Sequence, residues 1–495
     1  MFRVRTVKTA SGSLAVQIVR YERKRTIVLK HIGSGRNDRE VVLLKKEASM
    51  WIQDTSRQQS LFGRDGENEN RIIQLNKCKF LGTRYSFLYE TVSAVFHTIG
   101  FDTLERLLLD LVIMRIIKPS SKLHAVSLLQ QFFGIELTAS DIYRGMHRFA
   151  TLKDSVESIL VQFAKDKLNF DFNLVFYDVT TLYFESFTED ELRRCGFSKD
   201  NKGSQPQILI GLVVNRDGFP ISCAVFEGNK FEGHTLLPAV LAFKKKYTID
   251  TLTVIADAAM ISKENIRELL SHGLNYIVGA RLGNVSNKLI QTISQKLNQV
   301  DKKSIRLNTL NGYLICDFSL KRFHKDSQDL EKHIQKAEIF LKNPALTRKS
   351  RYLINTAKTT YALNRKLIDK TRLLLGIKGY YTNLNKPKKL IIERYHDLWK
   401  IEKSFRFAKS DLKIRPVYHF KMDTIQSHIL VCFMALATLK YLEIKTGQSA
   451  AKIIEYFMSI TDARLLDTVS GREINLRIEV TDEIKKLLKR IGLPY

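Results

Sequence analysis

One short basic segment combines the residue types that could bind a metal and a phosphate together. It reads Tyr395-His-Asp-Leu-Trp-Lys-Ile-Glu402-Lys-Ser-Phe-Arg406-Phe-Ala-Lys409. In a helix of about 100° per residue, Tyr395, Glu402 and Lys409 recur every seven residues and share one face, flanked by Trp399 and Arg406. A lone carboxylate among cations and aromatic rings suits a metal-phosphate site better than a solvated surface.

The other side of this segment is apolar. Its hydrophobic residues lie about a quarter turn or more away from the Glu402 face, at Leu398, Ile401, Phe405, Ala408 and Leu412. Such a stripe predicts one helix whose other side is buried.

Two more carboxylates lie upstream, in apolar surroundings. Asp178 is inside the run Leu174-Val-Phe-Tyr-Asp-Val-Thr-Thr-Leu-Tyr-Phe, and Asp257 follows Leu252-Thr-Val-Ile-Ala. An acid in a buried strand is costly to ionise unless it is paired or binds metal. Either aspartate alone could equally be a cap or a salt-bridge partner. Together with Glu402, they form a hard oxygen set suited to Mg²⁺ or Mn²⁺, and two such ions can catalyse phosphoryl transfer.

The elements that must position these acids lie in residues 172–283. Strands are predicted at 174–184, 207–214, 220–226, 252–257 and 276–279, with helices at 235–246 and 263–272. Asn215-Arg-Asp-Gly218 is a hairpin signal between the second and third strands. The predicted order is three strands, helix, strand, helix, strand. No phosphate-binding glycine loop of the P-loop type occurs, so nucleotide hydrolysis is not indicated.

Composition points to a polyanionic partner. The 495 residues include 80 Lys and Arg against 51 Asp and Glu, a formal net charge of +29. This excess costs self-repulsion and indicates nucleic acid first and an anionic membrane surface second. No apolar run approaches the roughly 18–20 residues of a membrane span. The longest, 429–439, predicts a buried helix. Five scattered cysteines without a Cys-x-x-Cys pair argue against a zinc site and for a reducing compartment.

The regions before the core divide by pattern. Residues 1–60 contain alternating runs and a Gly33-Ser-Gly turn, which predict a β-rich module. Residues 85–165 follow the helical period, with a break at Pro119 and a new helix capped by Ser140. A helix, a turn containing Gly134 and a basic helix together resemble a helix-turn-helix, and two packing helices would give the same pattern.

The predicted fold class is α/β, with a mixed-sheet catalytic core interrupted by an insertion before the last catalytic helix. The polar, Lys-rich insertion shows little pattern beyond a helix near 326–341, and residues 61–70 are a predicted linker. The predicted parts are a β-rich N-terminal module at 1–60, a helical candidate DNA-binding domain at 71–170, the core at 171–284 and 377–440, the insertion at 285–376, and a C-terminal helical region at 441–495.

The three acids stand in motifs that resemble the DDE transposases of bacterial insertion sequences. The first acid lies in Phe176-Tyr-Asp-Val-Thr-Thr and the second in Val254-Ile-Ala-Asp-Ala-Ala. The third resembles the branch with a Tyr-x2-Arg-x3-Glu-x6-Lys signature, which falls on Tyr395, Leu398, Glu402 and Lys409. Family-like residues also occur at Ser198-Lys-Asp, Pro206-Gln, Gly228-Asn and Arg415-Pro-Val-Tyr-His.

This resemblance implies an RNase H-like core, two Mg²⁺ or Mn²⁺ ions, and DNA cleavage and strand transfer at terminal inverted repeats. Asp178, Asp257 and Glu402 would be the catalytic and metal-binding acids. The DNA-contacting residues would be Tyr395, Trp399, Arg406 and Lys409, although a core tryptophan is an equally good interpretation of Trp399. The partners would be transposon-end and target DNA and a second copy of the chain, in a bacterial cytoplasm near the nucleoid, with no membrane.

One position departs from the signature. Leu398 stands where the branch has arginine, and Lys400 or Arg406 would have to supply that charge. Two other functions stay open on the sequence alone: a catalytically inactive DNA-binding protein derived from a transposase, and another RNase H-like nuclease.

Overall fold

The computed structural model describes residues 2–10, 12–22, 25–55, 75–197, 203–260, 262–310, 312–343, 350–357 and 360–494. The predicted linker at 61–70 and the Ser198-Lys-Asp motif lie outside the described residues. The chain forms two compact units. One comprises Met1–Tyr89, Gln131–Gly134 and Tyr456–Ile484, and the other Glu90–Gln130, Ile135–Glu455 and Lys485–Tyr495.

The first unit begins with a three-stranded antiparallel sheet in the order β1-β2-β3 (Phe2–Lys8, Leu14–Glu22, Arg25–Gly35). Helix α1 (Asp38–Thr55) packs on it through Val41, Leu44, Ala48, Trp51 and Ile52, which repeat at helical spacing. The Asn37 side chain accepts from the Glu40 amide at 2.9 Å and caps this helix. The β-rich prediction missed the helix. The predicted turn at Gly33 is wrong, since Gly33 pairs with Val16 inside β3.

A second sheet in this unit joins distant parts of the chain. Its order is β16-β15-β4 (Glu473–Arg477, Asp462–Asp467, Cys78–Arg84), and Asp462 pairs with Arg84. These strands correct two predictions, that residues 71–170 and 441–495 are helical. Strands β4 and β15 are almost 400 residues apart in the sequence, so no local pattern predicts that they pair.

The second unit contains most of the predicted helices. Pro119 separates two of them, as expected. The cap of α5 lies two residues earlier than predicted: Thr138, not Ser140, accepts from the Asp141 amide, and Asp141 bonds back to Thr138. The helices here, some of which cross into the first unit, are α2 (Ser86–Ile99), α3 (Arg106–Ile117), α4 (Lys122–Phe133), α5 (Ala139–Arg148), α6 (Lys153–Leu168), α14 (Met422–Thr446), α15 (Ala450–Ser459) and α16 (Asp482–Ile491).

The centre of this unit is a mixed sheet of eight strands in the order β10-β11-β14-β9-β8-β5-β6-β7. The β5–β8 and β8–β9 pairs are parallel and the others antiparallel. The predicted order of three strands, helix, strand, helix, strand is confirmed. These elements are β5 (Leu174–Tyr183), β6 (Gln207–Val214), β7 (Pro220–Glu227), α7 (Leu236–Lys246), β8 (Thr253–Ala256), α8 (Lys263–Ser271) and β9 (Asn275–Ala280).

The segment predicted as a nearly patternless insertion contains regular structure. Its hairpin β10–β11 pairs with β14 and lengthens the central sheet by two strands. Leu314, Cys316 and Phe318 of β11 lie in one hydrophobic cluster with Ile293 and Leu297. Its elements are α9 (Asn287–Leu297), β10 (Ser304–Thr309), β11 (Gly312–Phe318), α10 (Leu320–Lys342), β12 (Leu353–Ala357), β13 (Thr360–Leu363) and α11 (Arg365–Arg372), and β14 (Ile377–Thr382) follows as the first strand after it.

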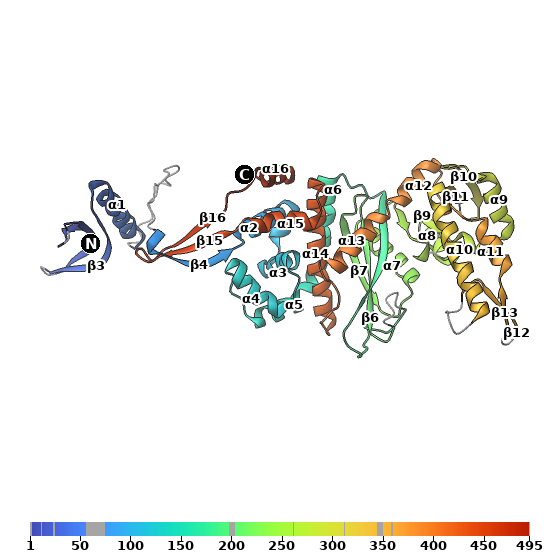
Figure 1. Ribbon diagram of the computed structural model, residues 1–495, viewed down its shortest axis with the longest axis horizontal. Helices are drawn as coiled ribbons and strands as arrows, with labels where there is room; N and C mark the ends of the chain where they lie inside the picture. Colours follow the sequence, from blue (N-terminus) through green and yellow to red (C-terminus); the bar gives the residue numbers. More distant parts are fainter. Residues whose placement is uncertain are drawn as a thin grey trace. The chain divides into compact units, whose positions relative to one another are not determined.

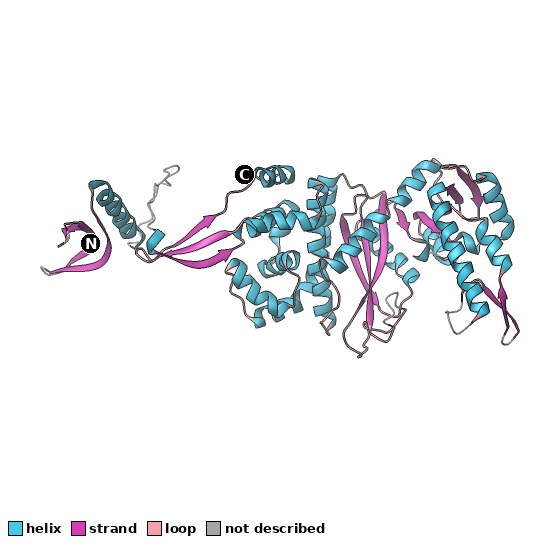
Figure 2. Ribbon diagram, in the orientation of Figure 1, coloured by secondary structure: helices cyan, strands magenta, loops and turns pink. Residues whose placement is uncertain are grey.

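Helices cover both faces of the sheet near β5 (Figures 1 and 2). Tyr177 points to one face, where its hydroxyl donates to Thr235 at the start of α7 at 2.9 Å. Thr180 points to the other face, where it shares a small cavity with Phe405 and Phe433. These two belong to α13 (Trp399–Ser410) and α14. Because side chains alternate along a strand, Asp178 lies on the same face as Thr180.

Helix α14 is buried inside this unit over most of its length. Twenty-five residues long, it is the one described helix that by length and composition could cross a membrane, and 94% of its most apolar window is buried inside the protein. The sequence analysis found no apolar run long enough to span a membrane, because polar residues interrupt this helix. The burial matches the predicted buried helix at 429–439.

Candidate active site

Two of the predicted acids lie at the same level on adjacent parallel strands. Phe176 of β5 pairs with Ile255 of β8. Asp178 and Asp257 each follow two residues later, so the register brings them side by side. Asp257 comes directly after the last residue of β8, at the carboxyl end of a parallel strand, where ligands often bind in α/β sheets.

The third acid comes from α13, and the single predicted helix is in fact two. Helix α12 (Lys388–His396) ends before α13 begins, and the joint carries tighter bonds, from the Leu398 amide to the Tyr395 carbonyl at 3.1 Å and from the Ile401 amide to the Leu398 carbonyl at 3.1 Å. Tyr395 therefore belongs to α12, while Glu402, Arg406 and Lys409 belong to α13. The apolar stripe is buried as predicted.

All three acids line one cavity of about 590 Å³. Cations line the same cavity, including the predicted Arg406 and Lys409 and the unpredicted Arg415. The three predicted acids thus meet in one cavity, carried by β5, the end of β8 and α13. A cavity with several carboxylates and several cations can hold a phosphate together with hard divalent cations.

A fourth carboxylate, Glu232, also lines this cavity and was missed. It begins a single helical turn, Glu232–His234, after β7. Buried side chains fix that turn: Thr235 donates to the Glu232 carbonyl at 2.6 Å, and Asn265 donates to the Gly233 carbonyl at 2.7 Å. Asn265 also donates to the Met260 carbonyl at 2.8 Å, in the turn that follows Asp257. The same amide therefore ties the two acid-bearing turns together.

Tyr395 is buried against the second acid. Its hydroxyl donates to Asp257 Oδ1 at 3.0 Å. Burial, then the charge and hydrogen bond of Asp257, raise the pKa of Tyr395, and the charges of Glu402 and Asp178 add to this. A Cβ at Gly279 would lie 2.5 Å from the Tyr395 hydroxyl, so glycine is needed for this approach. The structure thus shows Tyr395 orienting Asp257, and its predicted phosphate contact stays a prediction.

Lys378 of β14 lies behind Tyr395 and was also missed. Its ammonium stands 4.7 Å from the centre of the Tyr395 ring. Burial first, and then Arg322, lower the pKa of Lys378, whereas Asp257, Asp317 and Glu402 raise it. Its charge therefore acts on two of the acids. Lysines are frequent in this chain, so only the sheet pairing of β14 with β9 and β11 distinguishes this one.

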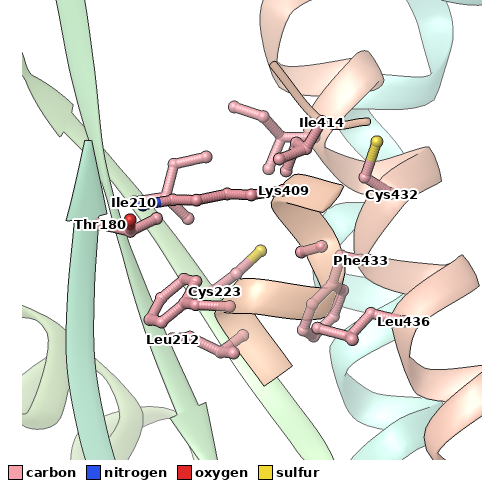
Figure 3. A pocket seen from close by; sticks show the side chains of 12 residues that line it. Thr180, Ile210, Leu212, Cys223, Lys409, Ile414, Cys432, Phe433 and Leu436 are labelled. Carbon is pink, nitrogen blue, oxygen red and sulfur yellow. The ribbon is translucent and has the colours of Figure 1, made fainter. Parts of the chain in front are cut away.

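Lys409 connects α13 to the first strand of the site. Its side chain runs from α13 toward Thr180 on β5, and the nitrogen at its tip lies close to that strand (Figure 3). The stem lies among Ile210, Ile414 and Cys432 in a small apolar cavity, while the residue also lines the larger cavity with Asp178. Apolar packing of the stem fixes where the charge is held.

The remaining signature positions fall in different surroundings. Leu398 is only 5% exposed, in the joint between α12 and α13, so it completes the core there. Lys400 does not line the cavity; it binds Asp397 at 3.2 Å and the Arg216 carbonyl at 3.0 Å. Arg406 does line the cavity. Trp399 is 55% exposed, which excludes the core-tryptophan alternative.

The donor set fits a hard divalent cation, since four carboxylates line one cavity and oxygen is the ligand that Mg²⁺ and Mn²⁺ prefer. Within the described residues, no three His, Cys, Asp or Glu side chains converge as closely as a single ion requires. Like charges repel one another, which favours such spacing of the carboxylates without a cation. The carboxylates thus suit the ion chemically, and they would have to move closer together to bind one ion.

Residues 170–438 match the family model described as "Transposase DDE domain". This match covers more than half of the chain and contains all three acids. The chain belongs to the transposase DDE domain family. Within this family's domain, the structure shows the mixed sheet, α12 and α13, and the cavity between the acids.

Two solved transposase structures are similar in part. The piggyBac transposase synaptic complex with hairpin DNA aligns at 10% identity over 83% of each chain, with a TM-score of 0.37. The Mos1 transposase paired-end complex with the left transposon end aligns at 12% identity over 47% of this chain and 66% of that chain, with a TM-score of 0.16. No curated protein matches the chain.

Proposed function

We propose that this transposase DDE domain protein binds the terminal inverted repeats of a bacterial insertion sequence and catalyses metal-dependent DNA cleavage and strand transfer. The observation that carries the proposal is the meeting of Asp178, Asp257 and Glu402 in one cavity within the family-matching region. Tyr395, Glu402 and Lys409 of the Tyr-x2-Arg-x3-Glu-x6-Lys branch all lie at or against this cavity, which supports that branch.

Two Mg²⁺ or Mn²⁺ ions, when bound, would activate the attacking oxygen and stabilise the leaving one. Asp178 and Asp257 would hold one ion, and Glu402 would help to hold the other. The Tyr395 hydroxyl orients Asp257 by donating a hydrogen bond to it, and it stays protonated because the pKa of Tyr395 is raised. Arg406 and Lys409 would hold the transposon-end phosphate, with Lys409 as a point charge and Arg406 in the place of the missing signature arginine.

Trp399 is exposed on α13 and would stack on an unpaired base near the cut. Joining two transposon ends requires two active sites, so a homodimer would form the synaptic complex. We place this activity in the bacterial cytoplasm, near the nucleoid, in keeping with the net charge of +29 and the scattered cysteines without a Cys-x-x-Cys pair.

A panel of substrates tests this function against its alternatives. The purified chain is incubated with Mg²⁺ or Mn²⁺ and one of three labelled molecules: a duplex with the terminal inverted repeat, a scrambled duplex, or an RNA–DNA hybrid. The proposal expects nicking at the repeat end only. Cleavage of the hybrid would identify another RNase H-like nuclease, and specific end binding without any cleavage would identify an inactive DNA-binding derivative.

A further inference from the structure

In the first unit, helix α1 packs on one face of the β1-β2-β3 sheet. Val4 and Ile18 point toward α1 and lie in the cluster that packs on it. Lys30 points the same way, with its ammonium 5.6 Å from the Trp51 ring. These three are paired across the sheet, Val4 with Ile18 and Ile18 with Lys30. Because side chains alternate along each strand, the neighbouring row points away from α1.

That outward row consists of polar residues that can read DNA bases. Arg5 pairs with Gln17, and Gln17 pairs with His31, so the three side chains form one line across the strands. Arginine binds guanine and glutamine binds adenine through paired hydrogen bonds in the major groove. The next row on this face consists of Arg3, Val19 and Val28. Val19 in the central strand is buried, whereas Val28 in the edge strand is 49% exposed, as an apolar contact for a thymine methyl group would be.

The dimensions and charge also suit a duplex. Neighbouring strands lie about 4.8 Å apart, so three strands span roughly 10 Å, against a major groove of about 12 Å. Residues 1–55 contain 12 Lys and Arg against 5 Asp and Glu, a net +7. An even distribution of the chain's +29 would give this segment less than half of that charge. This segment, sheet and α1 together, is therefore more positively charged than the chain average, which complements a polyanion.

The candidate helix-turn-helix compares poorly with this face. On α5, Arg144 binds Asp141 at 2.6 Å, His147 binds Asp423 at 2.5 Å, and Arg148 binds Glu105. By contrast, Arg3, Arg5 and His31 form no ion pair or side-chain hydrogen bond with any other described residue. Reading DNA through α5 would require breaking contacts inside the protein, whereas the sheet can bind without that cost.

We infer that the outward face of the β1-β2-β3 sheet is the sequence-reading surface of the protein, and that its ligand is the major groove of the transposon-end duplex. This inference rests on the proposed function for the identity of the DNA. It assigns base contacts to Arg5 and Gln17, with Arg3 and His31 at bases or phosphates beside them. Sequence recognition is thus attributed to the first unit and cleavage to the second.

The test measures binding to two labelled duplexes by fluorescence anisotropy: the terminal inverted repeat and a scrambled sequence of equal composition. The full chain carries Asp178→Asn throughout, so that binding is measured without cleavage. The inference expects Arg5→Ala/Gln17→Ala to lower the preference for the repeat at least tenfold, because these two side chains would distinguish the correct bases from the wrong ones. The matched control, Lys45→Ala/Lys46→Ala, removes two exposed cations of α1 and should keep the preference within about twofold of the parent.

A wild-type preference in Arg5→Ala/Gln17→Ala would overturn the inference, as would a loss of preference confined to Arg144→Ala/Arg148→Ala. Circular dichroism confirms that each variant is folded. The proposed function is tested separately, by cleavage of the repeat with the wild-type protein. If the sheet variants lose the preference but the wild type never cleaves the repeat, the assignment of the DNA-reading surface stands and the proposed catalytic function is wrong.

Discussion

At the scale of single residues, the site is defined by carboxylates whose neighbours hold them in place. Asp257 accepts from Tyr395, Tyr395 lies under Lys378, and Gly279 leaves room for the hydroxyl. Glu232 is supplied by a turn that Thr235 and Asn265 fix. Each acid is thus attached to a rigid element, as catalysis through positioned oxygen ligands requires.

Tyr395→Phe removes one donor to Asp257 and leaves the ring in place. A hydrogen bond to a charged group contributes about 1.5–3 kcal/mol, so we expect single-turnover cleavage of the end duplex to fall roughly 10- to 100-fold. Because the pKa of Tyr395 is raised, the wild-type rate should show no titration of this hydroxyl between pH 6 and 9.

Tyr441→Phe is the matched control, since its buried hydroxyl donates to the Ile491 carbonyl at 3.2 Å, away from the cavity. It should cleave at the wild-type rate. Normal cleavage by Tyr395→Phe would show that Asp257 needs no help from this hydroxyl.

At the scale of elements, the strands at 174–280 were predictable because their apolar runs are long and turn residues bound them. The acids were predictable because carboxylates stand out in such runs. Glu232 was not, since its sequence neighbours are polar, and Lys378 was not, since lysines are frequent in this chain; only tertiary pairing brings the two residues to the site. The break between α12 and α13 was not predictable either. Asp397 and Leu398 keep helical backbone angles, and no proline or glycine marks the joint.

The start of α5 offers a direct comparison of two caps. Thr138→Ala removes both the cap and its partner bond from Asp141, and should cost about 1 kcal/mol of unfolding free energy. Ser140→Ala, the residue favoured by the sequence, should cost almost nothing because it lies inside the helix and exposed. Urea unfolding of both variants measures the difference, and equal effects would contradict the assigned cap.

The segment after α13 carries two histidines that the fold keeps neutral. Burial first, then the charges of Lys122 and Arg115, lower the pKa of His419 to about 4 and the pKa of His428 well below 6.5. Below pH 6.5 the unfolded chain takes up protons that the folded chain does not, so stability falls as pH falls through this window. Between pH 7 and pH 5 we expect a loss of roughly 2 kcal/mol from His419 alone.

Urea unfolding at pH 7 and pH 5 measures this loss, and His419→Gln should make it smaller. Carboxylates with lowered pKa values titrate below this window and do not interfere. A midpoint that is the same at both pH values would show that these rings are already protonated in the folded protein.

At the scale of the whole molecule, the net charge of +29 and the cavity lined by acids and cations both suit the proposed polyanionic substrate. The central sheet uses β5, β8 and α13 to bring the acids together, and the insertion extends the same sheet through β10 and β11. The second sheet of the first unit shows the limit of sequence patterns, because β4 and β15 are far apart in the sequence and no local pattern predicts that they pair.

Duplex binding should depend steeply on salt. If six or more phosphates are contacted, raising the salt from 50 to 200 mM should weaken binding by about 10³ or more, through release of counterions. Anisotropy titrations at several salt concentrations give the slope. A flat response would mean that the positive charge serves something other than DNA.

The most direct test of the account is cleavage of a labelled duplex with the terminal inverted repeat, in Mg²⁺ or Mn²⁺, by the wild type and by Glu402→Ala. We predict metal-dependent nicking at the repeat end by the wild type, and undiminished binding without nicking by Glu402→Ala. Nicking by both proteins, or tight end binding without nicking by either, would contradict the assignment of Asp178, Asp257 and Glu402 as the catalytic acids.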